Sequence, residues 1–300
     1  MELKSTLMDG GYCWHPERMV CEGRSWTNSQ FPSLFALIEH PQRGLILFDT
    51  GYSSRFSEVT ARFPYKLYAI ATPVQARAED VAVSKLKRLG ISPSDISTVV
   101  ISHFHADHMG AIADFPNAEY VFAQRGWDAI KQKRGLSAVL QGVLPPLIPA
   151  DFEKRARGIE FKDRVTASVG SSPARQQIEK HFLTFDLFGD GTVQLVDLPG
   201  HMAGHMGISY LDHTGKQIFL VSDACWQSRS YRELLYPHQI AYFIMENKKR
   251  YKKTIQDLHE IYQACGDLAI LPTHCGEVYR DYVLERSWAP EALNGIRCCE

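Results

Sequence analysis

The sequence has no long apolar run, no excess of one charge and no regular cysteine pattern. Nowhere do about 18 consecutive apolar residues occur, so no membrane-spanning helix is predicted, and the first residues are too polar for a signal peptide. A formal net charge of −1 gives no electrostatic footprint for nucleic acid or an anionic membrane. Seven cysteines at irregular spacings are not a disulfide framework, and they favour the cytoplasm.

The remaining composition is that of a globular protein with a sizeable core, since 45% of the 300 residues are hydrophobic. Length alone leaves one large α/β domain or two smaller ones open. The chain shows no repeat at solenoid periods and no low-complexity tract.

Short apolar runs bounded by turn residues predict strands along the whole chain. The predicted strands are 33–39, 45–48, 96–101, 120–122, 182–185, 192–196, 208–210, 217–221 and 268–272. The first two form a hairpin that ends in Asp49-Thr50-Gly51. Apolar residues at helical spacing predict helices at 78–89 and at about 240–264. The stretch from about 126 to 180 has no strand period, and we interpret it as a helical and loop insertion folded over the site.

Four side chains that can bind metals lie within six residues, directly after the predicted buried strand at 96–101. They are His103, His105, Asp107 and His108. The spacing suits a tight loop whose side chains point to one centre, and it does not suit one face of a helix. The chain has only 12 histidines, so a chance surface cluster is a poor explanation for three of them here. The run therefore predicts a metal site.

One loop cannot surround two metal ions, so further ligands must come from elsewhere. The candidates are His201 in a Pro/Gly turn, Asp223 directly after an apolar strand, and His274 after the last strand. Taken singly, each is equally well a satisfied turn residue. All of them follow predicted strands, where α/β enzymes usually carry their chemistry.

Together these residues resemble the signature of the metallo-β-lactamase superfamily. Its H-x-H-x-D-H motif is matched by 103–108, its early Asp-Thr-Gly turn by 49–51, and its later ligands by His201, Asp223 and His274. The resemblance spans roughly 33 to 276. It implies an α/β fold of the metallo-β-lactamase-like αβ/βα sandwich type, with two facing mixed sheets and helices outside, in a single domain over 1–300.

The resemblance also implies two divalent metal ions. His103, His105 and His201 would bind the first, Asp107, His108 and His274 the second, and Asp223 would bridge both. Zinc is the expected metal, although nitrogen- and oxygen-rich ligands also suit iron or manganese. We interpret Asp49 as a residue of the turn or behind the ligands. His205 either orients a ligand, touches substrate, or is a polar turn residue.

Two ions about 3.5–4 Å apart can share a bridging hydroxide near neutral pH. This hydroxide would attack an ester, lactone or acyl-thioester carbonyl, while one metal stabilises the developing negative charge. Asp107 and Asp223 are the predicted catalytic carboxylates, because Asp223 bridges the ions and Asp107 can also steer the proton of the nucleophile. The expected partner is a small-molecule substrate, and a homodimer is left open.

Within the superfamily, the chain is most similar to the N-acyl-homoserine lactonases, which share Gly-His-x-x-Gly-His (200–205) and Asp-Ala (223–224). Those proteins usually place a tyrosine three residues after the bridging aspartate, where this chain has Trp226. Tyr231 and Tyr236 are the candidates to supply the missing hydroxyl. Cys225 and Cys275 are interpreted as core or pocket lining. Two alternatives to ester hydrolysis stay open: phosphodiester hydrolysis at the same site, and a metal-binding protein without catalysis.

Overall fold

The computed structural model describes residues 1–162 and 172–284, and these contain two mixed β-sheets. The larger sheet has the order β4-β1-β2-β3-β5-β6-β7, and the smaller has the order β12-β11-β10-β9-β8. The strands of the larger sheet are β1 (Lys4–Pro16), β2 (Asn28–His40), β3 (Gly44–Phe48), β4 (Val74–Gln75), β5 (Ile96–Val100), β6 (Glu119–Ala123) and β7 (Ala156–Ile159). Those of the smaller sheet are β8 (Thr184–Asp186), β9 (Val193–Asp197), β10 (Met206–Leu211), β11 (Gln217–Ser222) and β12 (Leu268–Pro272).

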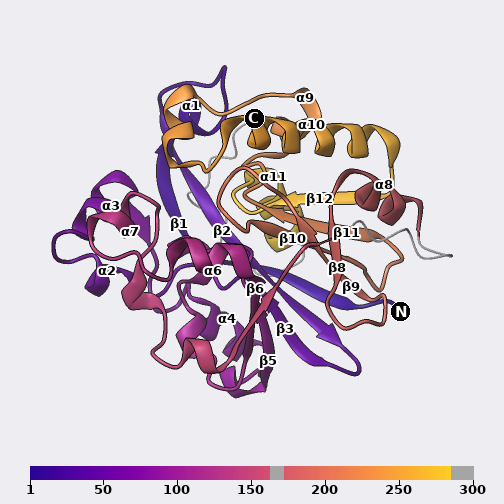
Figure 1. The fold of residues 1–300 in the computed structure, drawn as a ribbon, viewed down its shortest axis with the longest axis horizontal. Helices are drawn as coiled ribbons and strands as arrows, with labels where there is room; N and C mark the ends of the chain where they lie inside the picture. Colours follow the sequence, from indigo (N-terminus) through magenta and orange to yellow (C-terminus); the bar gives the residue numbers. More distant parts are fainter. Residues whose placement is uncertain (163–171, 285–300) are drawn as a thin grey trace.

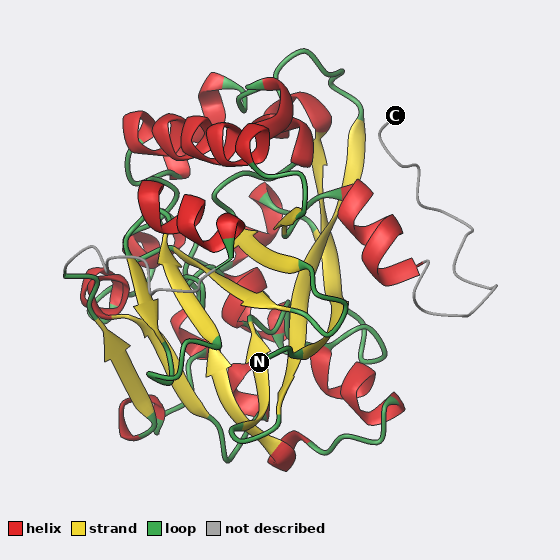
Figure 2. Ribbon diagram, turned by 90° about the vertical axis from the view of Figure 1, so that its right-hand side faces the viewer, coloured by secondary structure: helices red, strands yellow, loops and turns green. Residues whose placement is uncertain are grey.

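Helices lie on the outer face of each sheet (Figures 1 and 2). The α-helices are α1 (Glu17–Val20), α2 (Phe56–Val59), α3 (Lys66–Ala71), α4 (Ala82–Arg88), α5 (Ala106–Met109), α6 (Gln124–Ile130), α7 (Leu136–Val139), α8 (Pro173–His181), α9 (Ser228–Glu233), α10 (Lys248–Ala264) and α11 (Gly276–Tyr279). Short 3₁₀ turns are η1 (Pro93–Asp95), η2 (Ile112–Asp114), η3 (Pro145–Leu147), η4 (Phe152–Lys154) and η5 (Gln239–Ile244), and a π-helical turn, η6, spans Arg280–Leu284.

The two sheets pack face to face, which confirms the sandwich expected from the sequence. In β2, Ala36 and Ile38 face the core between the sheets, whereas Phe35 and Leu37 face the core under the helices. Because β2 is buried on both faces, its sequence is continuously apolar rather than alternating. A third core lies between the smaller sheet and the helices α8 and α10, where Ile255 packs.

The predicted hairpin is confirmed, since β2 and β3 pair antiparallel with Ala36 opposite Phe48. The sequence did not reveal β1, which precedes both and pairs with β2 along nearly its full length. Its pairing register shifts between Asp9 and Tyr12, where Gly10 and Gly11 lie. This irregularity interrupts the alternation that would have identified a strand.

Two predictions are corrected by the structure. The helix predicted at about 240–264 is a 3₁₀ turn, η5, followed by a separate helix, α10, because the Asn247 side chain accepts a hydrogen bond from the backbone N–H of Arg250 and starts a new helix there. The stretch 126–180 is not only helix and loop: β7 adds a strand to the sheet edge beside β6. Residues 163–171 of that stretch lie outside the described residues.

Within the described ranges, no helix is both long and apolar enough to cross a membrane.

Candidate metal centre

The seven side chains predicted as ligands converge where the strand ends of the two sheets meet, and all seven are buried. The larger sheet supplies four of them from the loop after β5 and from α5, and the smaller sheet supplies three from the ends of β9, β11 and β12. In that order they are His103, His105, Asp107, His108, His201, Asp223 and His274. Parallel alignment of β3 with β5 and of β11 with β12 brings these ends together.

Three imidazoles form the first group. Nε2 of His103 lies 2.9 Å from Nδ1 of His105, and Nε2 of His201 lies 3.1 Å from the same Nδ1. Burial lowers the pKa of all three below the usual histidine value. The rings are therefore neutral at physiological pH, and each has a nitrogen lone pair available for a metal ion.

The second group joins a carboxylate to two imidazoles. Oδ2 of Asp107 lies 3.4 Å from Nε2 of His108 and 3.2 Å from Nε2 of His274. Burial by itself raises the pKa of Asp107, but the two histidines hold it below the usual value. Burial lowers the pKa of His274, yet Asp223 and Asp107 raise it to about 10. This buried centre therefore stabilises positive charge.

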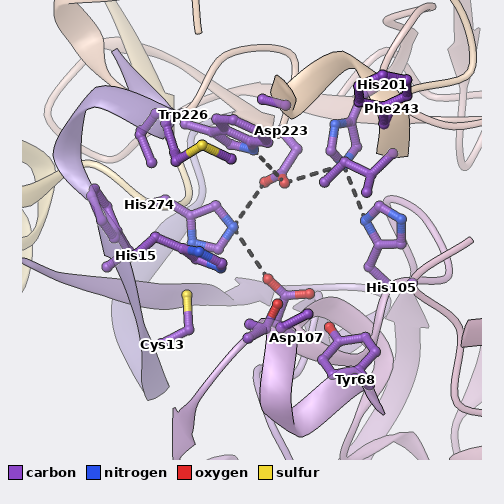
Figure 3. A pocket seen from close by; sticks show the side chains of 18 of the residues that line it. Cys13, His15, Tyr68, His105, Asp107, His201, Asp223, Trp226, Phe243 and His274 are labelled. Carbon is purple, nitrogen blue, oxygen red and sulfur yellow. Dashed lines mark hydrogen bonds and ion pairs between the residues drawn. The ribbon is translucent and has the colours of Figure 1, made fainter. Parts of the chain in front are cut away.

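Asp223 lies between the two groups (Figure 3). Its Oδ1 is 3.3 Å from Nε2 of His108 and 3.2 Å from Nε2 of His274. Its Oδ2 is 3.3 Å from Nε2 of His201. One carboxylate thus faces both groups, with one oxygen for each.

The arrangement fits a pair of cations. Nε2 of His108 and Oδ1 of Asp223 are buried and have no hydrogen-bond partner in the described structure. Such atoms are rare in native proteins, and a bound cation would satisfy both. A set of imidazole nitrogens and carboxylate oxygens suits zinc, iron or manganese better than magnesium or calcium.

Asp49 lies behind the ligands, as expected. Its Oδ2 accepts hydrogen bonds from Nδ1 of His108 and from Oγ of Ser102, both at 2.8 Å. The proton held on Nδ1 leaves Nε2 of His108 free to face the centre. Asp49 (φ 61°) and Ser222 (φ 49°) both adopt left-handed backbone conformations beside the site. Strain of this kind persists where surrounding contacts over-determine the geometry, and it clusters at functional sites.

Two further residues hold Asp223. The backbone N–H of Asp223 donates a hydrogen bond to Nε2 of His205 at 3.0 Å, and Nδ1 of His205 donates to the carbonyl of Leu198. The indole N–H of Trp226 donates to Oδ2 of Asp223 at 2.9 Å. His205 therefore orients the predicted ligand Asp223 rather than touching substrate. Trp226 contacts the carboxylate of Asp223 from the cavity side (Figure 3).

A cavity of about 360 Å³ opens onto the centre, and its lining is mainly apolar. Val139 and Gly142 reach it from the 126–180 stretch, so part of that stretch does lie over the site. The η5 turn contributes an apolar wall whose Phe243 is 87% exposed. Among the described residues that line the cavity there is no lysine and no arginine.

The polar lining residues that sequence reasoning missed include Cys13, His15 and Tyr68. They come from β1 and α3, which carry no recognisable motif. The prediction that Tyr231 or Tyr236 supplies the missing hydroxyl is wrong. Tyr231 is buried in the core and donates to the carbonyl of Ile270, and the hydroxyl of Tyr236 accepts from Gln256, so neither lines the cavity.

Of the two roles considered for Cys225 and Cys275, core or pocket lining, the structure shows that both are core residues. Both are fully buried, and neither lines the cavity. Burial raises the pKa of the Cys225 thiol well above its usual value, which makes a nucleophilic thiolate unfavourable there.

Comparisons with known proteins agree with the geometry. An N-acyl homoserine lactonase AttM from Azorhizobium caulinodans is 27% identical over 212 residues, 71% of this chain and 72% of that protein. The fold matches a solved N-acyl homoserine lactone hydrolase with N-hexanoyl-L-homoserine bound at its catalytic metal centre, with a TM-score of 0.69, 20% identity and coverage of 93% and 96% of the two chains. It also matches the dizinc quorum-quenching lactonase AidC, with a TM-score of 0.59, 15% identity and coverage of 92% and 88%.

Residues 29–215, more than half of the chain, match the family model described as the metallo-β-lactamase superfamily. That stretch includes the 103–108 run and His201, and the two remaining predicted ligands follow it along the chain. The chain belongs to the metallo-β-lactamase superfamily.

Proposed function

We propose that this metal-dependent hydrolase cleaves the ester bond of a lactone or a related carboxylic ester or acyl-thioester. The observation that carries the proposal is the placement of two groups of buried ligands, joined by Asp223, at the floor of an apolar cavity. The similar proteins named as lactonases support it. We also propose that residues 1–300 form a single domain. A cytoplasmic location is part of the proposal, because five cysteines of the described chain are free.

Two divalent ions, most simply zinc, are part of this proposal. His103, His105 and His201 would hold one ion, Asp107, His108 and His274 the other, and Asp223, which faces both groups, would contact both ions. When bound, such a pair supplies a hydroxide nucleophile at neutral pH and a Lewis acid for the substrate oxygen.

The residues of the chain do the remaining work. Asp49 and His205 fix the orientation of His108 and Asp223, so the ligands need little reorganisation during the reaction. The carboxylate of Asp107 faces the cavity and can accept a hydrogen bond from the attacking water, which steers its proton (Figure 3). The apolar walls exclude water from the reacting carbonyl, which strengthens every electrostatic interaction at the centre.

The cavity lining favours a carboxylic ester over a phosphodiester. A phosphodiester carries a negative charge throughout the reaction, and enzymes usually meet such a charge with arginine or lysine side chains. None lines this cavity in the described residues, whereas Phe31, Leu67 and Ile244 offer apolar contact. We therefore expect a neutral substrate with an apolar portion.

A substrate panel tests the proposal. The zinc-loaded protein should hydrolyse lactones, aryl esters or acyl-thioesters far faster than bis-p-nitrophenyl phosphate. Asp223→Ala, which removes the shared carboxylate, should abolish that hydrolysis and lower the metal content. Faster turnover of the phosphodiester would favour the phosphodiesterase alternative. Bound metal without turnover on any substrate would favour a non-catalytic role.

A further inference from the structure

Hydrolysis at a carbonyl moves negative charge onto the carbonyl oxygen, and hydrogen-bond donors aimed at that oxygen lower the barrier. The side-chain donors that line the cavity, apart from the predicted ligands, are few. They are Cys13, His15, Tyr52, Tyr68, Thr72 and Trp226.

Two of these donors are poorly placed to meet a substrate oxygen. The indole N–H of Trp226 donates to Asp223. The side chain of Tyr52 is almost completely buried, at 1% exposed.

The hydroxyl of Tyr68 differs from both. It points into the cavity next to the Asp107 carboxylate, on the side of the centre opposite Trp226 (Figure 3). The side chain is 9% exposed, and no described residue hydrogen-bonds its hydroxyl. Its ring packs edge to face on Phe56, with centroids 5.6 Å apart, and Phe56 packs in the same way on Tyr52. This aromatic row holds the hydroxyl in a fixed direction before any ligand arrives.

We propose that Tyr68 is a catalytic residue that hydrogen-bonds the substrate oxygen on which negative charge develops. The inference rests on the proposed ester hydrolysis. Addition of hydroxide to the carbonyl carbon moves the π electron pair onto the oxygen. The Tyr68 O–H donates to that oxygen and keeps its own proton, and the bond to the leaving alkoxide or thiolate then breaks as the carbonyl re-forms. The hydroxyl thus stabilises the transition state without being consumed.

The test is Tyr68→Phe, which removes one oxygen and keeps the ring. The matched control is Tyr65→Phe on the same segment, whose hydroxyl accepts from the backbone N–H of Gly135 and does not line the cavity. Three quantities are measured for the wild type and both variants: metal content, kcat and KM on the best ester or lactone, and the Kd of an alkyl phosphonate that mimics the tetrahedral species.

For Tyr68→Phe we expect two metal equivalents as in the wild type, a kcat lowered by roughly 10²-fold with little change in KM, and weaker phosphonate binding. Tyr65→Phe should match the wild type. A kcat and a phosphonate Kd within twofold of the wild type overturn the inference. Equal losses in both variants, or loss of metal in Tyr68→Phe, also overturn it, because Tyr68 would then only support the fold.

Failure of the proposed function looks different. If the wild type hydrolyses no ester, lactone or thioester, ester hydrolysis is wrong, and phosphonate binding alone decides about Tyr68. If Tyr68→Phe then binds the phosphonate more weakly than the wild type does, the inferred contact between the Tyr68 hydroxyl and the anionic oxygen is retained. Equal binding, or no binding by any of the three proteins, rejects it.

Discussion

Asp223 is the residue on which both groups of ligands depend, and its position is fixed from three directions. Its backbone N–H donates to His205, its Oδ2 accepts from Trp226, and Ser222 before it adopts a left-handed conformation. A carboxylate held in this way can meet two cations without rearranging. Trp226 is therefore more than an apolar wall of the cavity.

Trp226→Phe tests the hold on Asp223. Phenylalanine retains much of the apolar contact but has no N–H, so Oδ2 of Asp223 loses a donor. We expect the affinity for zinc to fall by about 10- to 100-fold, measured by competition with a chromophoric chelator. Trp26→Phe is the matched control, because Trp26 is 54% exposed and does not line the cavity. Equal zinc affinity in both variants and in the wild type would contradict this role.

The predicted ligands could be recognised from the sequence because four of the seven lie within one short run. The others were identified as strand-end residues that complete the resemblance. Tyr68 could not be found in this way, since it lies on a helix of only six residues without a motif. Its direction depends on packing against Phe56, which is a tertiary contact and leaves no pattern in the sequence.

At the scale of elements, the turn after α7 supports the metal centre directly. A Cβ on Gly142 would lie 2.7 Å from Cδ2 and 2.8 Å from Nε2 of His105, closer than side chains tolerate. Gly142 also has φ +67°, which disfavours any other residue. The stretch 126–180 therefore sets the position of one predicted ligand.

Gly142→Ala should displace the His105 ring. We expect zinc affinity to fall by about 10- to 100-fold, and hydrolysis to fall with it at limiting zinc. Gly189→Ala is the control, because Gly189 has φ +72° and no atom within 4 Å of the added Cβ. It carries the same backbone strain without the clash. Loss of zinc affinity in both variants would mean that strain alone is responsible and that the contact with His105 is irrelevant.

The elements were predictable where one physical signal dominated. The strand predicted at 268–272 is β12 with the same bounds, because a short, continuously apolar run suits a strand buried on both faces. The strand β7 was missed because its sequence, Ala-Arg-Gly-Ile, has little strand propensity. It pairs because the neighbouring β6 offers its backbone at the sheet edge. The break at Asn247 was missed because the apolar residues before and after it were assigned to one amphipathic helix.

At the scale of the whole molecule, the two sheets meet at a centre rich in buried ionised groups. Asp107 and Asp223 stay ionised because neighbouring histidines lower the pKa of each, although burial opposes this. Bound cations would compensate these charges in the folded state alone. Metal binding is therefore coupled to the stability of the whole fold.

Removal of metal should lower the melting temperature. Each ion present at 100 times its Kd adds about 2.7 kcal/mol to the free energy of unfolding. For a chain of 300 residues, two such ions correspond to a shift of roughly 9 °C, measured by calorimetry before and after chelation. Returning zinc should restore the original value. A melting temperature that does not respond to chelation would place the ions, if any, outside the folded core.

Metal-dependent hydrolysis by a shared two-ion centre is tested most directly by titrating zinc into the metal-free protein while lactone hydrolysis is followed. The account predicts no hydrolysis without metal, a rate that rises with added zinc, and a plateau at two equivalents per chain. A rate that does not depend on zinc, or a protein saturated with zinc that leaves lactones, esters and thioesters intact, would contradict it.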